Sequence, residues 1–251
     1  MTNSTIQTQL AHRTIRRFTA DPVSPEDLAN LVAVARQTAS SSGAQLSSVI
    51  RVTDPTLKTQ VATICRQPYV AEAPELWITL VDAARGARVV AAKGYDETRV
   101  ATMDVFFQAA TDAVLLAQNV ATAAESLGLG TCFLGSILND PAALIELLGM
   151  PPRTFPVLGL MVGHPAQAPQ LKPRMPMDLR LFENHYVDAG DGVLDDLAEY
   201  DAQLTTYYDL RDANRRVDSY TEQLTRLLLR DDPERNGLLR VVSDQGFDLA
   251  L

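Results

Sequence analysis

The sequence predicts an α+β domain followed by a C-terminal helical extension. Four short apolar runs have the length and composition of strands, and they alternate with stretches in which apolar residues recur at helical spacing. After His164 the pattern changes, because residues 165–176 contain four prolines and only helical patterns follow. The four expected strands are residues 46–53, 75–82, 131–135 and 155–163.

The first elements have clear sequence signals. Residues 4–10 can form a short helix. Three residues mark the start of the next helix. Ser24 can cap it, Pro25 suits its first position, and Asp27 completes a pattern like a capping box. The small residues 38–43 end this helix, and their hydroxyls and amides can bind a polar ligand closely.

The remaining helices follow from proline, glycine and apolar spacing. Helices are expected after Asp54 and after Asp140, since each is followed by proline. Residues 98–127 form the longest helical pattern, which Gly128 and Gly130 terminate. Its apolar character on most sides predicts burial on several sides or a place at a subunit interface. The later helical patterns span residues 193–208, 219–230 and 233–243.

Composition restricts the functional classes. The 251 residues are 46% hydrophobic, and 22 Lys and Arg against 31 Asp and Glu give a formal charge of -9. This charge argues against general affinity for nucleic acid or an anionic membrane. The first residues do not resemble a signal peptide, so a cytoplasmic, unanchored protein is expected. Cys65, Cys132 and three scattered histidines indicate neither a disulfide framework nor a metal site.

A basic stretch at residues 12–18 is the main chemical feature of this acidic chain. If the stretch is extended, His12, Thr14 and Arg16 face one way over roughly 13 Å, the reach of a mononucleotide-like cofactor from phosphate to ring. The other reading is that these are surface bases paired with carboxylates. Lys172 and Arg174 admit the same two readings, although prolines around them favour a phosphate clamp.

Other chemical motifs are weaker. Gly128-Leu129-Gly130 follows a helix and lacks a third glycine, so it is neither a dinucleotide fingerprint nor a phosphate loop. No Gly-x-Ser-x-Gly elbow occurs, which leaves a hydrolytic triad unsupported but open. Cys132 lies in an apolar run, where core packing is favoured over a nucleophile.

Four segments occur in order along the chain, namely residues 12–16, 40–42, 123–130 and 171–174. Their order resembles the FMN-dependent nitroreductase family, in particular its oxygen-insensitive NADPH nitroreductase and flavin reductase subgroup. The resemblance covers nearly the whole chain. It implies a mixed, mainly antiparallel sheet flanked by helices, in an intertwined homodimer with FMN at the subunit interface. Residues 1–251 would form one domain, with residues 177–251 as a helical extension packing on the partner.

The resemblance assigns roles at the flavin to individual residues. Thr14 stands where the family usually has serine. Arg16 looks like the base beside the flavin pyrimidine, where its charge would tune the reduced flavin. Gln67 would bond the ring edge. The phosphate ligands would be His12, Arg13, Lys172 and Arg174; Ser40, Ser41 and Ser42 would reach FMN from the opposite subunit; and Leu134, Gly135 and Ser136 would lie beside the isoalloxazine.

The implied reaction is ping-pong. NADPH gives hydride to flavin N5 and leaves, and a nitroaromatic, quinone or similar acceptor then takes two electrons, so no side chain need be catalytic. The alternatives are a flavin reductase that supplies reduced FMN, or a flavin carrier or sensor with little turnover. Arg211, Arg215 and Arg216 match the family's basic segment that would bind the 2′-phosphate of NADPH. The alternative is that these arginines form ion pairs with Asp209, Asp212 and Asp218.

The chain departs from the subgroup at two positions. Leu138 replaces an arginine near the pocket for the acceptor and the nicotinamide. Phe133 stands where tyrosine is common. Both changes bear on acceptor preference and, to a lesser degree, on the preference for NADPH over NADH.

Overall fold

The computed structural model describes residues 3–211 and 218–249, with only the backbone described for residues 208–211. The chain divides into two compact units. The sheet unit comprises Met1–Pro169 and Pro233–Leu251, and the helical unit comprises Gln170–Asp232. The expected C-terminal extension began at residue 177, whereas the second unit begins at Gln170 and the chain rejoins the sheet unit at Pro233.

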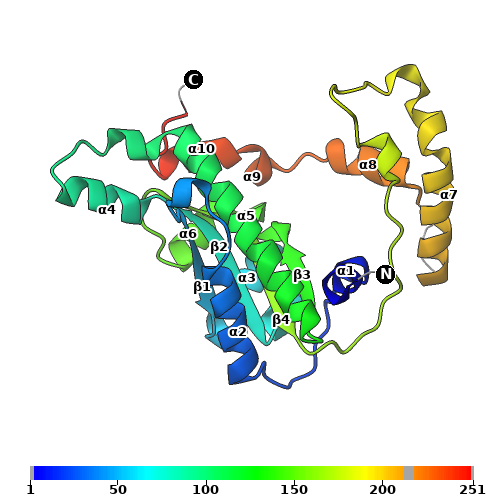
Figure 1. Cartoon of the computed structure of the whole chain (residues 1–251), viewed down its shortest axis with the longest axis horizontal. Helices are drawn as coiled ribbons and strands as arrows, with labels where there is room; N and C mark the ends of the chain where they lie inside the picture. Colours follow the sequence, from blue (N-terminus) through cyan, green and yellow to red (C-terminus); the bar gives the residue numbers. More distant parts are fainter. Residues whose placement is uncertain (1–2, 212–217, 250–251) are drawn as a thin grey trace. The chain divides into compact units, whose positions relative to one another are not determined.

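The described part of the sheet unit contains a four-stranded sheet in the order β1-β2-β4-β3, and every strand pair in it is antiparallel (Figure 1). One parallel bridge, between Thr14 and Thr131, adds a short extended segment beside β3. The prediction of a mixed, mainly antiparallel sheet is therefore confirmed. The strands are β1 Ser47–Val52, β2 Glu75–Asp82, β3 Gly130–Leu134 and β4 Thr154–Gly163, each within a residue of its expected bounds.

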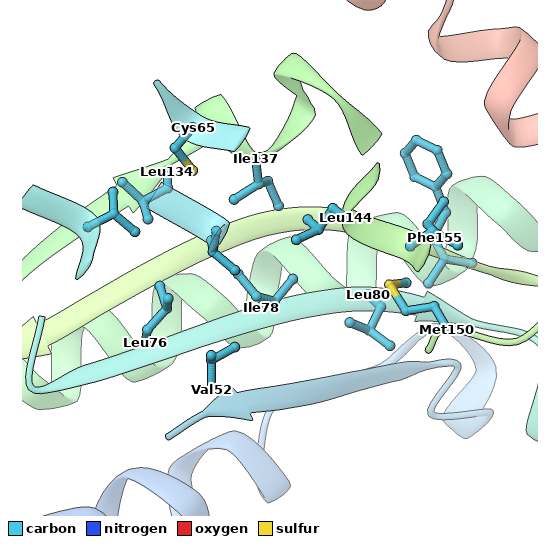
Figure 2. Packing of buried hydrophobic residues seen from close by; sticks show 14 of the residues in the cluster. Val52, Cys65, Leu76, Ile78, Leu80, Leu134, Ile137, Leu144, Met150 and Phe155 are labelled. Atoms are coloured by element: carbon cyan, nitrogen blue, oxygen red, sulfur yellow. The ribbon is translucent and has the colours of Figure 1, made fainter. Parts of the chain in front are cut away.

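Both faces of the sheet are covered. On one face Leu76, Ile78 and Leu80 of β2 pack in a cluster with residues of α3 (Pro55–Cys65) and α6 (Pro141–Leu147) (Figure 2). On the other face Trp77 packs in a cluster with residues of α2 (Pro25–Arg36) and α5 (Met103–Ser126). The continuous apolar run of β2 follows from this two-sided burial.

The predicted helix starts are confirmed by their capping hydrogen bonds. The Ser24 hydroxyl accepts from the N–H of Asp27 at 3.0 Å, and the Asp54 carboxylate accepts from the N–H of Leu57 at 2.9 Å. Asp140 caps α6 in the same way. In the first segment of the chain, α1 spans Ser4–Leu10, as expected.

The glycines after the long helix have two separate roles. Gly128 ends α5 with φ +80°, and the N–H of Leu129 donates to the carbonyl of Ala124 at 3.0 Å. Gly130 instead permits a close approach, because a Cβ there would lie 2.7 Å from Cγ1 of Ile15. The helix begins at Met103 and not at residue 98, since Thr98–Ala101 form a 3-10 turn (η3) before it.

Two helical regions differ from expectation. Helix α4 (Ala84–Ala92) was not predicted, because Ala83 at its N-cap supplies no capping side chain. The helix expected over residues 233–243 is two helices, α9 (Pro233–Asn236) and α10 (Leu238–Asp244). Gly237 separates them, consistent with the poor helix propensity of glycine.

The helical unit is built on α7 (Val193–Arg211) and α8 (Tyr220–Leu228). Leu204 is fully buried, and Tyr200 donates to the carbonyl of Pro173 at 3.4 Å. Ser219 caps α8. The proline-rich segment 165–176 contains no helix or strand, as expected. Short 3-10 turns lie at η5 (Met177–Leu179) and η6 (Gly190–Gly192).

None of the helices described by the structure is both long and apolar enough to cross a membrane.

Candidate functional site

The basic stretch is held along the sheet, in keeping with the extended arrangement considered above. Thr14 forms the parallel bridge with Thr131 of β3, and the N–H of Ile15 donates to the carbonyl of Thr131 at 2.8 Å. Further along, the N–H of Thr19 donates to the carbonyl of His164 at 2.9 Å. Within the stretch, the side chain of Ile15 is buried, which fixes the register of the stretch on β3.

The first two bases are held differently. Nδ1 of His12 lies 2.7 Å from Oε1 of Glu125 at the end of α5, and the Thr131 hydroxyl donates to the same oxygen at 2.5 Å. The guanidinium of Arg13 donates to the carbonyl of Ala11 at 2.8 Å, and Arg13 is exposed. Both bases are therefore ordered at the start of the stretch.

Arg16 lies beside Tyr69 and Cys132. Burial raises the pKa of the Tyr69 hydroxyl, while Arg16 acts in the opposite direction through its charge and a hydrogen bond. Burial also raises the pKa of the Cys132 thiol to about 11, against the opposing charge of Arg16. A thiol with this pKa is protonated at neutral pH, which agrees with a packing role for Cys132.

Gln67 and Ser136 are hydrogen-bonded to each other. The Ser136 hydroxyl donates to Oε1 of Gln67 at 3.0 Å, joining the turn η2 (Pro68–Glu72) to the turn η4 (Gly135–Asn139). Tyr69, the neighbour of Arg16, lies within η2. The structure thus brings together five of the expected flavin contacts, namely Arg16, Gln67, Leu134, Gly135 and Ser136.

Arg235 of α9 also reaches this region, which the sequence analysis missed. Its Nη2 donates to the carbonyl of Gly135 at 2.5 Å. Its Nε is buried and has no partner among the residues that the structure describes. No local motif marks Arg235, because its position depends on the return of the chain to the sheet unit after the helical unit.

The serine run lies at another part of α5. The N–H of Ser41 donates to Oδ1 of Asp112 at 2.7 Å, and its hydroxyl donates to Gln108 at 3.2 Å. Asp112 is only 2% exposed. The residue that holds His12, Glu125, is roughly 20 Å further along the same helix at 1.5 Å per residue. Within one chain, Ser40, Ser41 and Ser42 and the basic stretch are therefore anchored at separate places.

The remaining expected site residues belong to the helical unit. Lys172 and Arg174 line a cavity of about 450 Å³ that also contains the side chains of Tyr200, Tyr220 and Arg226. Their part in a phosphate clamp stays a prediction. Arg211 ends α7 and is described only in its backbone, whereas Arg215 and Arg216 lie outside the described residues.

Asp218, one of the possible partners of Arg211, Arg215 and Arg216, contacts a different arginine. Asp218 accepts from Arg226 at 2.7 Å. Among the described side chains, no group of three or more His, Cys, Asp or Glu could hold a metal ion.

Comparisons with known proteins agree with this geometry. A family model described as "Nitroreductase family" matches residues 10–164, and one described as "Nitroreductase family, C-terminal domain" matches residues 172–250. The chain is 35% identical over 244 residues to a protein named oxygen-insensitive NADPH nitroreductase from Salmonella typhimurium, covering 97% of this chain and 98% of that protein.

The chain is also similar to a protein sequence and to a solved structure from Bacillus subtilis. The chain is 33% identical over 248 residues to a protein named FMN reductase (NADPH), with 98% of this chain and 99% of that protein covered. The solved structure of the NfrA1 nitroreductase superposes with a TM-score of 0.91 at 33% identity, covering 97% of this chain and 98% of the other. On this evidence the chain belongs to the nitroreductase family.

Proposed function

We propose that the protein is an FMN-dependent oxidoreductase that takes electrons from NADPH and passes them to nitroaromatics, quinones or similar small acceptors. Its similarity to an NADPH nitroreductase over almost the entire chain supports this reaction. The observation that carries the proposal is the fixed register of the basic stretch on β3, which places Arg16 beside Tyr69 and the Gln67–Ser136 contact.

The residues at this place fit a flavin ring. Because Oε1 of Gln67 accepts from Ser136, the amide N–H groups of Gln67 are left to donate to a ring edge. The space above Gly135 is open, since a Cβ there would meet its nearest neighbour, Nη2 of Arg235, only at 4.0 Å. A flat ligand can therefore approach this backbone closely.

When bound, FMN supplies the redox chemistry, by accepting two electrons as hydride and giving them to the acceptor. Arg16 would place a positive charge next to the pyrimidine of a bound flavin, where it would stabilise negative charge on the ring. The protein's thiols are unsuited to act as nucleophiles, because burial raises the pKa of both Cys132 and Cys65. We therefore assign no side chain as a covalent catalyst.

His12 and Arg13 would hold the phosphate, joined by Lys172 and Arg174, with Thr14 supplying a hydroxyl. Arg13 is exposed, and its guanidinium donates through one nitrogen to the carbonyl of Ala11, so its other N–H groups can donate to an anion. We infer that the 2′-phosphate of NADPH binds Arg211, Arg215 and Arg216. In that case, neutralising these three arginines raises KM for NADPH more than KM for NADH.

A homodimer is part of the proposal. Three apolar side chains of α5 are exposed in the single chain: Phe107 at 65%, Val114 at 47% and Leu115 at 45%. A second subunit would cover them. It would also explain why the serine run and the basic stretch are anchored roughly 20 Å apart on α5, since Ser40, Ser41 and Ser42 would serve the partner's flavin.

The C-terminal extension would complete the dimer. We propose that residues 177–232 pack on the partner. Residues after 232 contact their own sheet unit, as Arg235 shows. A purely monomeric protein in multi-angle light scattering would contradict the homodimer.

A flavin reductase is the second candidate, favoured by the 33% identity to the FMN reductase (NADPH) of Bacillus subtilis. The distinction lies in whether free FMN is itself a good electron acceptor. Turnover with free FMN that exceeds turnover with every nitroaromatic and quinone tested would select the flavin reductase.

Flavin binding is the first test of both candidates. Titration of the purified protein with FMN should quench flavin fluorescence and saturate at one FMN per chain. Arg16→Ala should bind FMN more weakly and be reduced by NADPH more slowly even at saturating FMN. A wild-type protein that does not bind FMN would overturn both candidates.

A further inference from the structure

We propose that Glu125 is a positioning residue for the phosphate end of FMN: it fixes His12 as an imidazolium whose second N–H is presented to the phosphate. The inference rests on the proposed function and adds a residue that does not itself touch the cofactor. It starts from the contact of 2.7 Å between Nδ1 of His12 and Oε1 of Glu125.

The hydrogen-bond chemistry fixes the direction of this contact. An ionised carboxylate only accepts hydrogen bonds, so Nδ1 of His12 must donate to Glu125. The other ring nitrogen, Nε2, then decides what the histidine can bind. A neutral ring would present a lone pair there and repel the oxygens of a phosphate, whereas an imidazolium presents a second N–H. Phosphate binding by His12 therefore requires the charged ring.

Glu125 is held so that it can stabilise this charge. Its carboxylate also accepts from the Thr131 hydroxyl at 2.5 Å, and its side chain is only 15% exposed. Thr131 is fully buried, and its backbone carbonyl accepts from Ile15. One residue of β3 thus fixes both the carboxylate and the register of the basic stretch, which sets the position of the imidazole ring.

The place of Glu125 on its helix is informative. It lies in the last turn of α5, where the helix dipole disfavours a negative charge, and that turn contains no basic residue. A carboxylate close to a bound phosphate is also unfavourable by itself. An imidazolium removes both disadvantages, because the His12–Glu125 pair is then neutral overall. Arg13 is left to supply net positive charge to the phosphate.

This arrangement predicts an effect confined to the phosphate end. Glu125→Gln keeps the size of the side chain and an oxygen acceptor but removes the charge that stabilises the imidazolium. We expect affinity for FMN to fall about five- to tenfold, the difference between a charge-assisted and a neutral hydrogen bond. Affinity for riboflavin, which lacks the phosphate, should change less than about twofold.

The test measures dissociation constants of FMN and riboflavin for the full-length protein by fluorescence quenching. Glu146→Gln, the same change at an exposed glutamate of α6, serves as the matched control and should leave both constants unchanged. A double-mutant cycle gives a readout that does not depend on riboflavin. In a His12→Ala background, Glu125→Gln should weaken FMN binding less than about twofold, because the partner is already absent.

The outcomes separate the possibilities. Equal loss of FMN affinity with and without His12 would show that Glu125 acts only in holding α5 to β3, and would overturn the inference. Tighter FMN binding in Glu125→Gln would show that the carboxylate repels the phosphate, and unchanged FMN binding would show that its charge has no effect there; either result would also overturn the inference. If the wild type binds FMN and Glu125→Gln binds it equally well, only the inference about Glu125 fails and the proposed function stands. A wild-type protein that binds no FMN removes the proposed function itself.

Discussion

The carboxylate of Asp112 accepts a hydrogen bond of 2.7 Å from the backbone N–H of Ser41, which fixes the serine run to the middle of α5. The run needs such an anchor. Ser42 has φ +51° and Gly43 has φ +67°, so two successive residues are left-handed, and such a backbone persists only where its surroundings hold it.

Asp112→Ala should release the serine run. We expect FMN affinity to fall several-fold, since the hydroxyls of the run would lose their fixed position. Asp112→Asn retains a side-chain oxygen that can accept from Ser41, so it should bind FMN nearly as well as wild type. FMN titration of the two variants checks this. Equal loss in both would mean that the charge of Asp112, and not its hydrogen bond, is what matters.

Arg235→Ala should disturb the backbone beside the proposed flavin ring. The variant loses the hydrogen bond to the carbonyl of Gly135, and a hydrogen bond from a charged donor contributes about 1.5–3 kcal/mol. We expect slower turnover with nitroaromatic acceptors at saturating FMN. Arg240→Ala, an exposed arginine of α10, is the matched control and should leave the turnover rate unchanged. Equal rates in the two variants would contradict a role for Arg235.

Glu75 should make stability depend on acid pH. Burial raises the pKa of this carboxyl, but hydrogen bonds from Arg51 and Trp77 and nearby positive charge outweigh it, so the pKa lies below the ordinary value of 4.5. A carboxyl with a lowered folded-state pKa stabilises the fold above its unfolded pKa, and this stability is lost as the pH falls through the folded value.

The free energy of unfolding of the wild type should therefore decline below about pH 4.5, and part of that decline should be absent in Glu75→Gln. At pH 7 the variant should be less stable by about 2 kcal/mol, because the two-point contact with Arg51 is weakened. Urea denaturation at several pH values measures both effects. Parallel pH curves for the two proteins would refute this assignment.

Gly130→Ala should separate the basic stretch from β3. The added methyl group would lie 2.7 Å from Cγ1 of Ile15, so Ile15 and the backbone around it must move. We expect lower FMN affinity together with a loss of stability of about 1–3 kcal/mol from overpacking. Gly192→Ala, where a Cβ meets nothing within 4 Å, should be close to wild type. Undiminished FMN binding by Gly130→Ala would mean that the register of the stretch does not matter.

Much of the fold was predictable because its signals are local. The apolar run of β2 and the caps at Ser24 and Asp54 each depend on a few adjacent residues. Helix α4 has a weaker signal, since alanine stands at its N-cap and the carboxylate that accepts from the N–H of Arg85 belongs to Asp82, the last residue of β2.

The candidate site was only partly predictable for the same reason. The concentration of bases at residues 12–18 can be read from those residues alone, and the family resemblance points to Gln67 and Ser136. The contacts of Arg235 and Asp112 join distant parts of the chain, and no spacing along the sequence contains that information.

The most direct test of the proposed reaction is anaerobic reduction of the FMN-loaded protein, monitored through the visible absorbance of the flavin. One equivalent of NADPH should bleach the flavin in the absence of any acceptor, and a nitroaromatic or quinone added afterwards should restore the absorbance with two electrons transferred per flavin. Flavin that stays oxidised with NADPH, or that is reduced but cannot be reoxidised by any such acceptor, would contradict the proposed function.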